Sequence, residues 1–230
     1  MSYYGYILLF SFLGPLALSF DQKVAYYKKI PRIILPLLLV SGLFLIWDQW
    51  FTELGVWGFN LVHTAHIVIG KLPLEEVLFF IIIPYNCLFI YEVIGAYFHI
   101  ENKTKFNRLF FLVLFILGLS LIALQPAGWY TLCSVLLAIL MGLTLLVLNP
   151  GWLTQLILSF LVCLLPFLIV NGLLTGVATE LPVVWYSPRE ISGWRILTIP
   201  LEDVFYNFDL FVGFVAFFNL DTRRLFLRKQ

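Results

Sequence analysis

The chain alternates between long apolar runs and shorter polar breaks. A helix that crosses a bilayer needs about 20 mostly apolar residues. Seven runs meet this requirement, at residues 3–20, 31–49, 73–98, 106–124, 128–148, 152–174 and 198–220. Two of the connections, residues 50–72 and 175–197, are long enough to hold structure of their own. The pattern predicts an all-α integral membrane protein with about seven transmembrane helices.

Composition supports lipid as the main solvent of the chain. Of its 230 residues, 62% are hydrophobic and 12% are charged, against about 25% charged in ordinary soluble domains. The net charge of +1 gives no support for nucleic-acid binding, and three cysteines inside apolar runs suggest no disulfide framework. The first apolar run lacks a basic leading segment and a clear cleavage site, so we expect a retained first helix.

The basic residues predict how the helices are oriented. Three arginines and lysines lie on one side of the predicted membrane, at Lys71, Arg189 and Arg195. Eleven lie on the other side, at Lys23, Lys28, Lys29, Arg32, Lys103, Lys105, Arg108, Arg223, Arg224, Arg228 and Lys229. The positive-inside rule therefore places the N-terminus outside and the C-terminus in the cytoplasm. A bacterial plasma membrane is the expected location.

A short acidic motif occurs twice. PLEEV at residues 73–77 recurs as PLEDV at 200–204, and we call the displacement from Pro73 to Pro200 the repeat offset. In both places an apolar helix and a long loop come before the motif, which then opens the next helix. We therefore predict two parallel three-helix repeats, residues 1–100 and 128–230, joined by a bridging helix within residues 101–127. Both acidic pairs then lie near the same, non-cytoplasmic, face.

Either motif alone is explained as a helix start. Proline suits the first helical position, and acids in the first turn complement the helix dipole by about 0.3–1 kcal/mol. The repetition favours a site instead, as do two further acids, Asp48 and Asp209. Asp209 follows Glu202 by seven residues, hence on the same helical face and about 10 Å further along. A charge near the bilayer centre costs at least about 2.5–3.5 kcal/mol, so Asp209 is expected to be protonated, partnered or facing a polar cavity.

Aromatic residues follow the acids at helical spacing. Most of the tryptophans on this side are interpreted as an interfacial belt. Carboxylic acids kept protonated by apolar surroundings are proton donors, and aromatic faces attract cations. These two ingredients suit a site that protonates a carbon–carbon double bond and shelters a carbocation, without a metal or a redox cofactor. The predicted catalytic residues are Glu75, Glu76, Glu202 and Asp203. The predicted substrate- or cation-stabilising residues are Asp48, Phe79, Phe80, Phe205, Tyr206, Asn207 and Asp209.

The duplicated motif on a duplicated membrane chain resembles the heterodimer-type lycopene cyclases, in the form with fused halves. The resemblance covers nearly the whole chain. It implies a role in carotenoid biosynthesis, as an isomerase that closes the acyclic ψ-ends of lycopene into β-rings, first to γ-carotene and then to β-carotene. The family motif Pro-x-Glu-(Glu/Asp) carries over to Pro73, Glu75, Glu76, Pro200, Glu202 and Asp203.

The resemblance leads to a mechanistic expectation. Glu75 or Glu202 donates a proton to the terminal double bond, and a carboxylate of the opposing motif removes a ring proton. Both motifs are expected to converge on one site, with the second end of the substrate reacting after release and turning. Replacing either glutamate by glutamine is then expected to abolish both cyclisations.

Other functions fit the sequence less well. There is no G-x-G-x-x-G after a strand, so the sequence gives no case for a flavin or nicotinamide domain. His63 and His66 lack a further ligand set, and a metal is not expected. Two alternatives stay open: a hydratase of the same family, in which water captures the cation, and a small proton- or cation-coupled transporter using Glu92 and Asp209 with the paired acids. A lipophilic polyene such as lycopene and the bilayer are the expected partners, and the oligomeric state is open.

Overall fold

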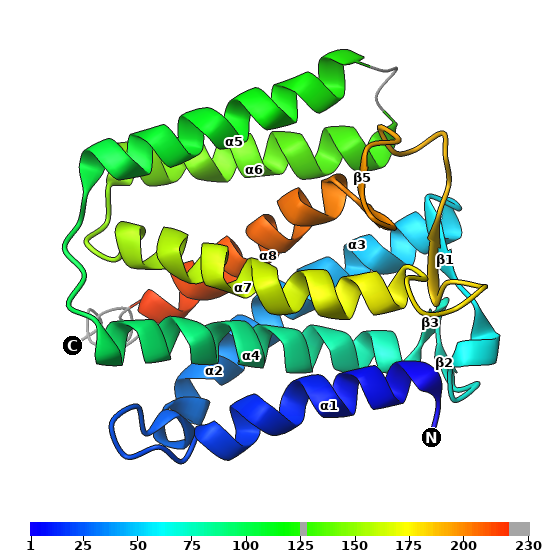
Figure 1. Ribbon diagram of the computed structural model, residues 1–230, viewed down its shortest axis with the longest axis horizontal. Coiled ribbons are helices and arrows are strands. Elements are labelled where there is room, and N and C mark those ends of the chain that lie inside the picture. The colour runs from blue at the N-terminus through cyan, green and yellow to red at the C-terminus, as the bar shows by residue number, and fades with distance from the viewer. Residues whose placement is uncertain (125–127, 221–230) are drawn as a thin grey trace, which may run out of the picture.

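The computed structural model describes residues 1–124 and 128–220 (Figure 1). Most of this chain is helical, in α1 (Tyr3–Leu18), η1 (Tyr26–Lys29), α2 (Ile30–Pro36), η2 (Leu37–Ser41), α3 (Gly42–Glu53), η3 (Leu61–His63), α4 (Leu74–Tyr97), α5 (Thr104–Leu124), α6 (Trp129–Leu148), α7 (Leu153–Leu174) and α8 (Glu202–Asn219). The strands are short: β1 (Trp57–Phe59), β2 (Val68–Ile69), β3 (Leu72–Pro73), β4 (Val184–Tyr186), β5 (Arg195–Ile196) and β6 (Ile199–Pro200).

All seven predicted apolar segments coincide with helices. Five helical segments are long and apolar enough to cross a membrane: residues 26–53, which run from η1 to α3, then α4, α5, α6 and α7. Helix α1 is apolar but shorter, and α8 carries three acids. The five long helices indicate an integral membrane protein. The seven-span topology and the orientation stay predictions, the latter partly because Arg223, Arg224, Arg228 and Lys229 lie outside the described residues.

The strands add a feature that an all-α prediction does not contain. They form three antiparallel two-stranded ladders, β1 with β4, β2 with β3 and β5 with β6. The labelled strands gather at the end of the helical bundle where the N-terminus lies (Figure 1). The hairpins β2–β3 and β5–β6 come directly before α4 and α8, so each acidic motif starts its helix from the base of a hairpin.

The repeat offset recurs throughout these ladders. It carries β1 onto β4, β2 onto β5 and β3 onto β6. In the β1–β4 ladder Gly58 pairs with Trp185, and these two positions are themselves related by the repeat offset. Such pairing is what an approximate two-fold axis between the halves requires. The domain boundaries at residues 100 and 128 stay a prediction.

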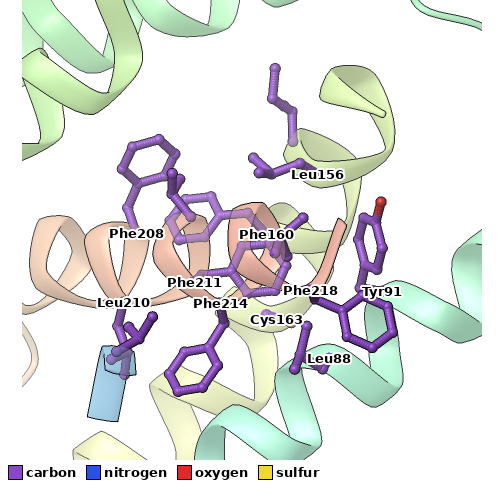
Figure 2. Close-up of a cluster of buried hydrophobic side chains, with 14 of the residues drawn as sticks. Leu88, Tyr91, Leu156, Phe160, Cys163, Phe208, Leu210, Phe211, Phe214 and Phe218 are labelled. Atoms are coloured by element: carbon purple, nitrogen blue, oxygen red, sulfur yellow. The ribbon is translucent and has the colours of Figure 1, made fainter. Parts of the chain in front are cut away.

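Helix α8 forms the centre of the bundle. Most of its side chains are buried on every face, including its three acids, whereas a helix at the lipid surface buries only one stripe. Figure 2 shows aromatic and aliphatic side chains of α8 packed against those of α4 and α7, among them Phe208, Phe211 and Phe214. This packing fixes the rotation of α8 and therefore the directions in which its first-turn acids point.

Prolines inside the helices free backbone carbonyls, because proline has no N–H and so cannot bond the carbonyl four residues earlier. Pro84 frees the carbonyl of Phe80, which accepts a hydrogen bond from Ser41 Oγ. Pro15 frees the carbonyl of Ser11, which accepts from Asn86 Nδ2 at 3.0 Å. Neighbouring helices thus satisfy carbonyls that lipid could not.

Removing one of these bonds should destabilise the fold. Replacing Ser41 by alanine leaves the buried Phe80 carbonyl without its donor, so we expect a loss of about 1–3 kcal/mol in unfolding free energy. Thermal unfolding in detergent measures this loss. The control is Ser120→Ala, because Ser120 is only half-buried and its hydroxyl bonds the carbonyl of Ile116 in its own helix. Equal melting temperatures for the two variants would contradict this account.

Candidate active site

The first acid of each motif holds loops together. Glu75 and Glu202 each accept one hydrogen bond from a hydroxyl at the start of a distant helix and one from a backbone N–H ten residues earlier in the chain. The donors are Ser2 and Ala65 (2.7 Å) for Glu75, and Thr131 (2.6 Å) and Ser192 (2.5 Å) for Glu202. The two sets of bonds are closely alike. These acids therefore fix the helix starts and their preceding loops.

The second acid of each motif points into a shared cavity between the halves. This cavity has a volume of about 70 Å³ and contains Glu76, Asp203 and Asp48, which are 8%, 4% and 2% exposed. Its remaining lining residues are Tyr4, Trp57, Phe59, Phe79, Phe80, Ile83, Tyr130, Phe167, Asn171, Leu174, Val184, Tyr186, Tyr206, Asn207 and Leu210. We call it the catalytic cavity, after the role proposed for it below. It gathers three carboxyl groups from α3, α4 and α8 among mostly aromatic walls.

Asp203 is surrounded by hydrogen-bond donors. Tyr130 OH donates to its Oδ1, while Asn171 Nδ2 and Tyr186 OH donate to its Oδ2 at 2.6 and 2.8 Å. Donors to a carboxylate favour its charged form over its neutral form. Asp203 is therefore arranged as an anion that can accept a proton.

Asp48 and Glu76 have fewer donors. Glu76 Oε2 accepts from Tyr4 OH at 2.7 Å. Asp48 Oδ1 accepts from Trp57 Nε1 at 2.5 Å and, at 3.4 Å, from Thr52 Oγ1. Asp48 Oδ2 has no partner among the described residues. A buried pair of carboxyl groups with so few donors is expected to keep a proton, because two adjacent buried charges are costly.

Tyr186 lies outside the helices, on β4, and stays a donor. Burial raises the pKa of its phenol well above the ordinary value, and the nearby Asp203 carboxylate raises it further. The phenol therefore remains protonated at neutral pH and keeps its hydrogen bond to Asp203.

Aromatic rings enclose the space beside the acids. The Tyr206 ring lies 5.0 Å from both Phe44 and Trp47, and Trp57 lies 4.9 Å from Tyr130, between ring centroids. The Tyr206 hydroxyl has no partner among the described residues. Rings around a carbocation stabilise it through their quadrupoles and keep water away.

The structure brings some predicted residues to the cavity and places others elsewhere. Asp48, Glu76, Phe79, Phe80, Asp203, Tyr206 and Asn207 line it. Glu75 and Glu202 do not line the cavity and instead make the hydrogen bonds to loop N–H groups described above. Phe205 packs toward Gly118 of α5. Asp209 is fully buried with no partner for either oxygen among the described residues, and it does not line the cavity.

Several cavity residues escaped sequence analysis. Tyr4 and Tyr130 open α1 and α6, and Trp57 and Tyr186 lie on the paired strands β1 and β4. Trp57 is one of the tryptophans on the side where an interfacial belt was predicted, yet it is only 5% exposed and donates to Asp48. The available signal was positional, since β1 and β4 share the offset of the acidic motifs.

Comparison with known proteins identifies the family. The lycopene cyclase family model matches residues 1–94 and again residues 127–220, which together make up most of the chain. The chain belongs to the lycopene cyclase family. Its two matched regions each contain one acidic motif, consistent with a lycopene cyclase of the fused-halves form. No curated protein and no solved structure matched the chain. Membership supports carotenoid cyclisation as the general activity.

The loop role of Glu202 can be tested separately from catalysis. Glutamine keeps a carbonyl oxygen that can accept from Ser192 N and Thr131 Oγ1, whereas leucine leaves both buried donors unsatisfied. We expect Glu202→Leu to lose about 1–3 kcal/mol or more of unfolding free energy and Glu202→Gln to lose much less. Thermal unfolding and hydrogen exchange at the Ser192 amide measure this difference. Equal protection of that amide in both variants would refute the role.

Proposed function

We propose that this lycopene cyclase closes the acyclic ends of lycopene into β-rings by acid–base catalysis, giving γ-carotene and then β-carotene. The observation that carries the proposal is the unequal hydrogen bonding of three carboxyl groups in one aromatic cavity. Asp203 has three donors to its one carboxyl group, whereas Asp48 and Glu76 have three between their two carboxyl groups, one of them at 3.4 Å. One site thus contains both a proton source and a proton acceptor, in opposite protonation states.

The reaction begins with proton transfer. A proton held by the Asp48–Glu76 pair adds to the terminal carbon–carbon double bond of the substrate and leaves a tertiary carbocation. The neighbouring double bond attacks this cation and closes a six-membered ring, which moves the positive charge onto the ring. Asp203 then removes a ring proton, and the electron pair of the broken carbon–hydrogen bond forms the new double bond. One proton enters and one leaves, so the reaction is an isomerisation.

This assignment differs from the sequence-based expectation that Glu75 or Glu202 donates the proton. Neither of these residues lines the catalytic cavity, and each is engaged with a loop N–H and a hydroxyl. They position the helices that carry Glu76 and Asp203. We therefore propose that both glutamates are positioning residues, and that each can be replaced by glutamine with cyclisation retained.

The cavity is shared, which supports a single site. Glu76 comes from the first half, and Asp203 with its donors Tyr130, Asn171 and Tyr186 comes from the second. Acid and base are therefore contributed by different halves, and each ring closure uses both. The two ends of the substrate react in turn, with release between them.

The acid at the opposite end of the bundle gives little support for the alternative function of a transporter. Glu92, near the C-terminal end of α4, forms an ion pair with Lys29. It is therefore committed to a local contact rather than continuing a path from the catalytic cavity.

Two aspartates on α8 provide a matched test. Asp203→Asn removes the proton acceptor and should abolish ring formation, because an amide cannot take the ring proton. Asp209→Asn changes a buried acid of the same helix outside the cavity and should retain ring formation. Pigments of lycopene-accumulating cells that express each variant are analysed, with the amount of membrane protein checked. Loss of cyclic carotenes in Asp209→Asn but not in Asp203→Asn would overturn the proposal.

A further inference from the structure

A second, larger cavity adjoins the catalytic cavity. It has a volume of about 580 Å³ and lies between α1, α4 and α7, and we call it the side cavity. Five residues line both cavities: Phe79, Ile83, Phe167, Asn171 and Asn207. The two spaces therefore adjoin, with these side chains at the boundary between them. Ligand sites in proteins commonly have volumes of about 300–1,000 Å³, so the side cavity is large enough to hold a molecule.

The side cavity is elongated and reaches the outer surface of the bundle. Its lining runs along α4 from Phe79 to Ile90, a rise of about 16 Å at 1.5 Å per residue. Along α1 it runs from Tyr3 to Pro15, about 18 Å. Phe10 on α1 and Ile169 on α7, two further lining residues, are 70% and 60% exposed on the outer surface of the bundle, which is predicted to face lipid. The cavity thus opens between α1 and α7 toward the hydrocarbon.

The corresponding space in the other half is filled. The repeat offset relates Asn171 to Phe44, Asn207 to Phe80, and Tyr206 to Phe79. The ring of Phe44 lies 5.0 Å from that of Tyr206 and 6.5 Å from that of Phe80. In the first half the large rings of Phe44 and Phe80 therefore fill the space that the smaller Asn171 and Asn207 leave open in the second half. The approximate two-fold symmetry of the scaffold is broken at the site where a long substrate would lie.

We propose that the side cavity binds the linear polyene chain of the substrate while its acyclic end lies in the catalytic cavity. The chain enters from the bilayer between α1 and α7. This inference rests on the proposed function. The occupant follows from three features: a boundary shared with the cavity that holds the carboxyl groups, an elongated and largely apolar lining, and an opening toward the surface predicted to face lipid. A linear hydrocarbon fits all three, whereas a polar ligand would leave its hydrogen-bonding groups unsatisfied there.

Ser11 on α1 is suited to testing this assignment. It lines the side cavity but not the catalytic cavity, and it lies about 10 Å along α1 from Tyr4. Ser11→Trp therefore places bulk partway along the proposed chain site. Its matched control is Leu13→Trp, on the same helix, because Leu13 is exposed and lines neither cavity.

The first measurement compares lycopene with a truncated polyene that has the same acyclic end but a shorter chain. We expect Ser11→Trp to lower lycopene conversion by roughly tenfold or more, a change equivalent to about 1.4 kcal/mol. Conversion of the truncated polyene should stay near that of Leu13→Trp. If Ser11→Trp loses both substrates equally, or loses neither, the side cavity does not hold the chain.

A second measurement follows binding without turnover. Lycopene retained through purification is measured by absorbance for Asp203→Asn combined with Ser11→Trp, and for Asp203→Asn combined with Leu13→Trp. Retention only in the combination with Leu13→Trp supports the assignment, and equal retention overturns it. If the wild-type protein fails to cyclise lycopene while retention still depends on Ser11, the proposed function fails and the chain site stands.

Discussion

Burying carboxyl groups at the end of an apolar helical bundle is the constraint on which the rest of this structure depends. Each such group is costly unless donors surround it or it keeps its proton. The donors to Asp203 come from α6, α7 and β4, and the donor to Glu76 comes from α1. Because Glu76 with its donor lies in the first half and Asp203 with its donors lies in the second, the cavity that they share forms only when both halves are packed together. Packing of the two halves therefore also brings together the groups that we propose act in catalysis.

The near-symmetry of the scaffold makes its departures informative. The position equivalent to Asp48 is Thr175, and the position equivalent to Asn171 is Phe44. One half thus adds a third carboxyl group, and the other adds an amide donor to Asp203. Duplication supplies an acidic motif from each half at one end of the bundle, and in the proposed mechanism these substitutions make one side a proton source and the other a proton acceptor. A strictly symmetric pair would offer two groups of the same kind.

Much of this arrangement is visible in the amino-acid sequence. Apolar runs locate the helices because length and hydropathy are local properties, and the repeat offset places both acidic motifs at one end because equivalent helices share a direction. Which of Glu75 and Glu76 faces inward is set by the packing of α4 against α1 and α8, which no local pattern specifies. Trp57 and Tyr186 reach the cavity only because β1 pairs with β4 across a long stretch of chain. The repeat offset relates the two segments but does not show that they pair, so these donors were missed.

The central claim is that an exchangeable carboxyl proton starts the reaction and a carboxylate ends it. Converting lycopene in membranes equilibrated with heavy water tests this most directly, with the product analysed by mass spectrometry. The account predicts one deuterium retained for each ring closed, on the carbon that the acid protonates, with no added oxygen. Cyclic products without deuterium, or products heavier by a molecule of water, would contradict it.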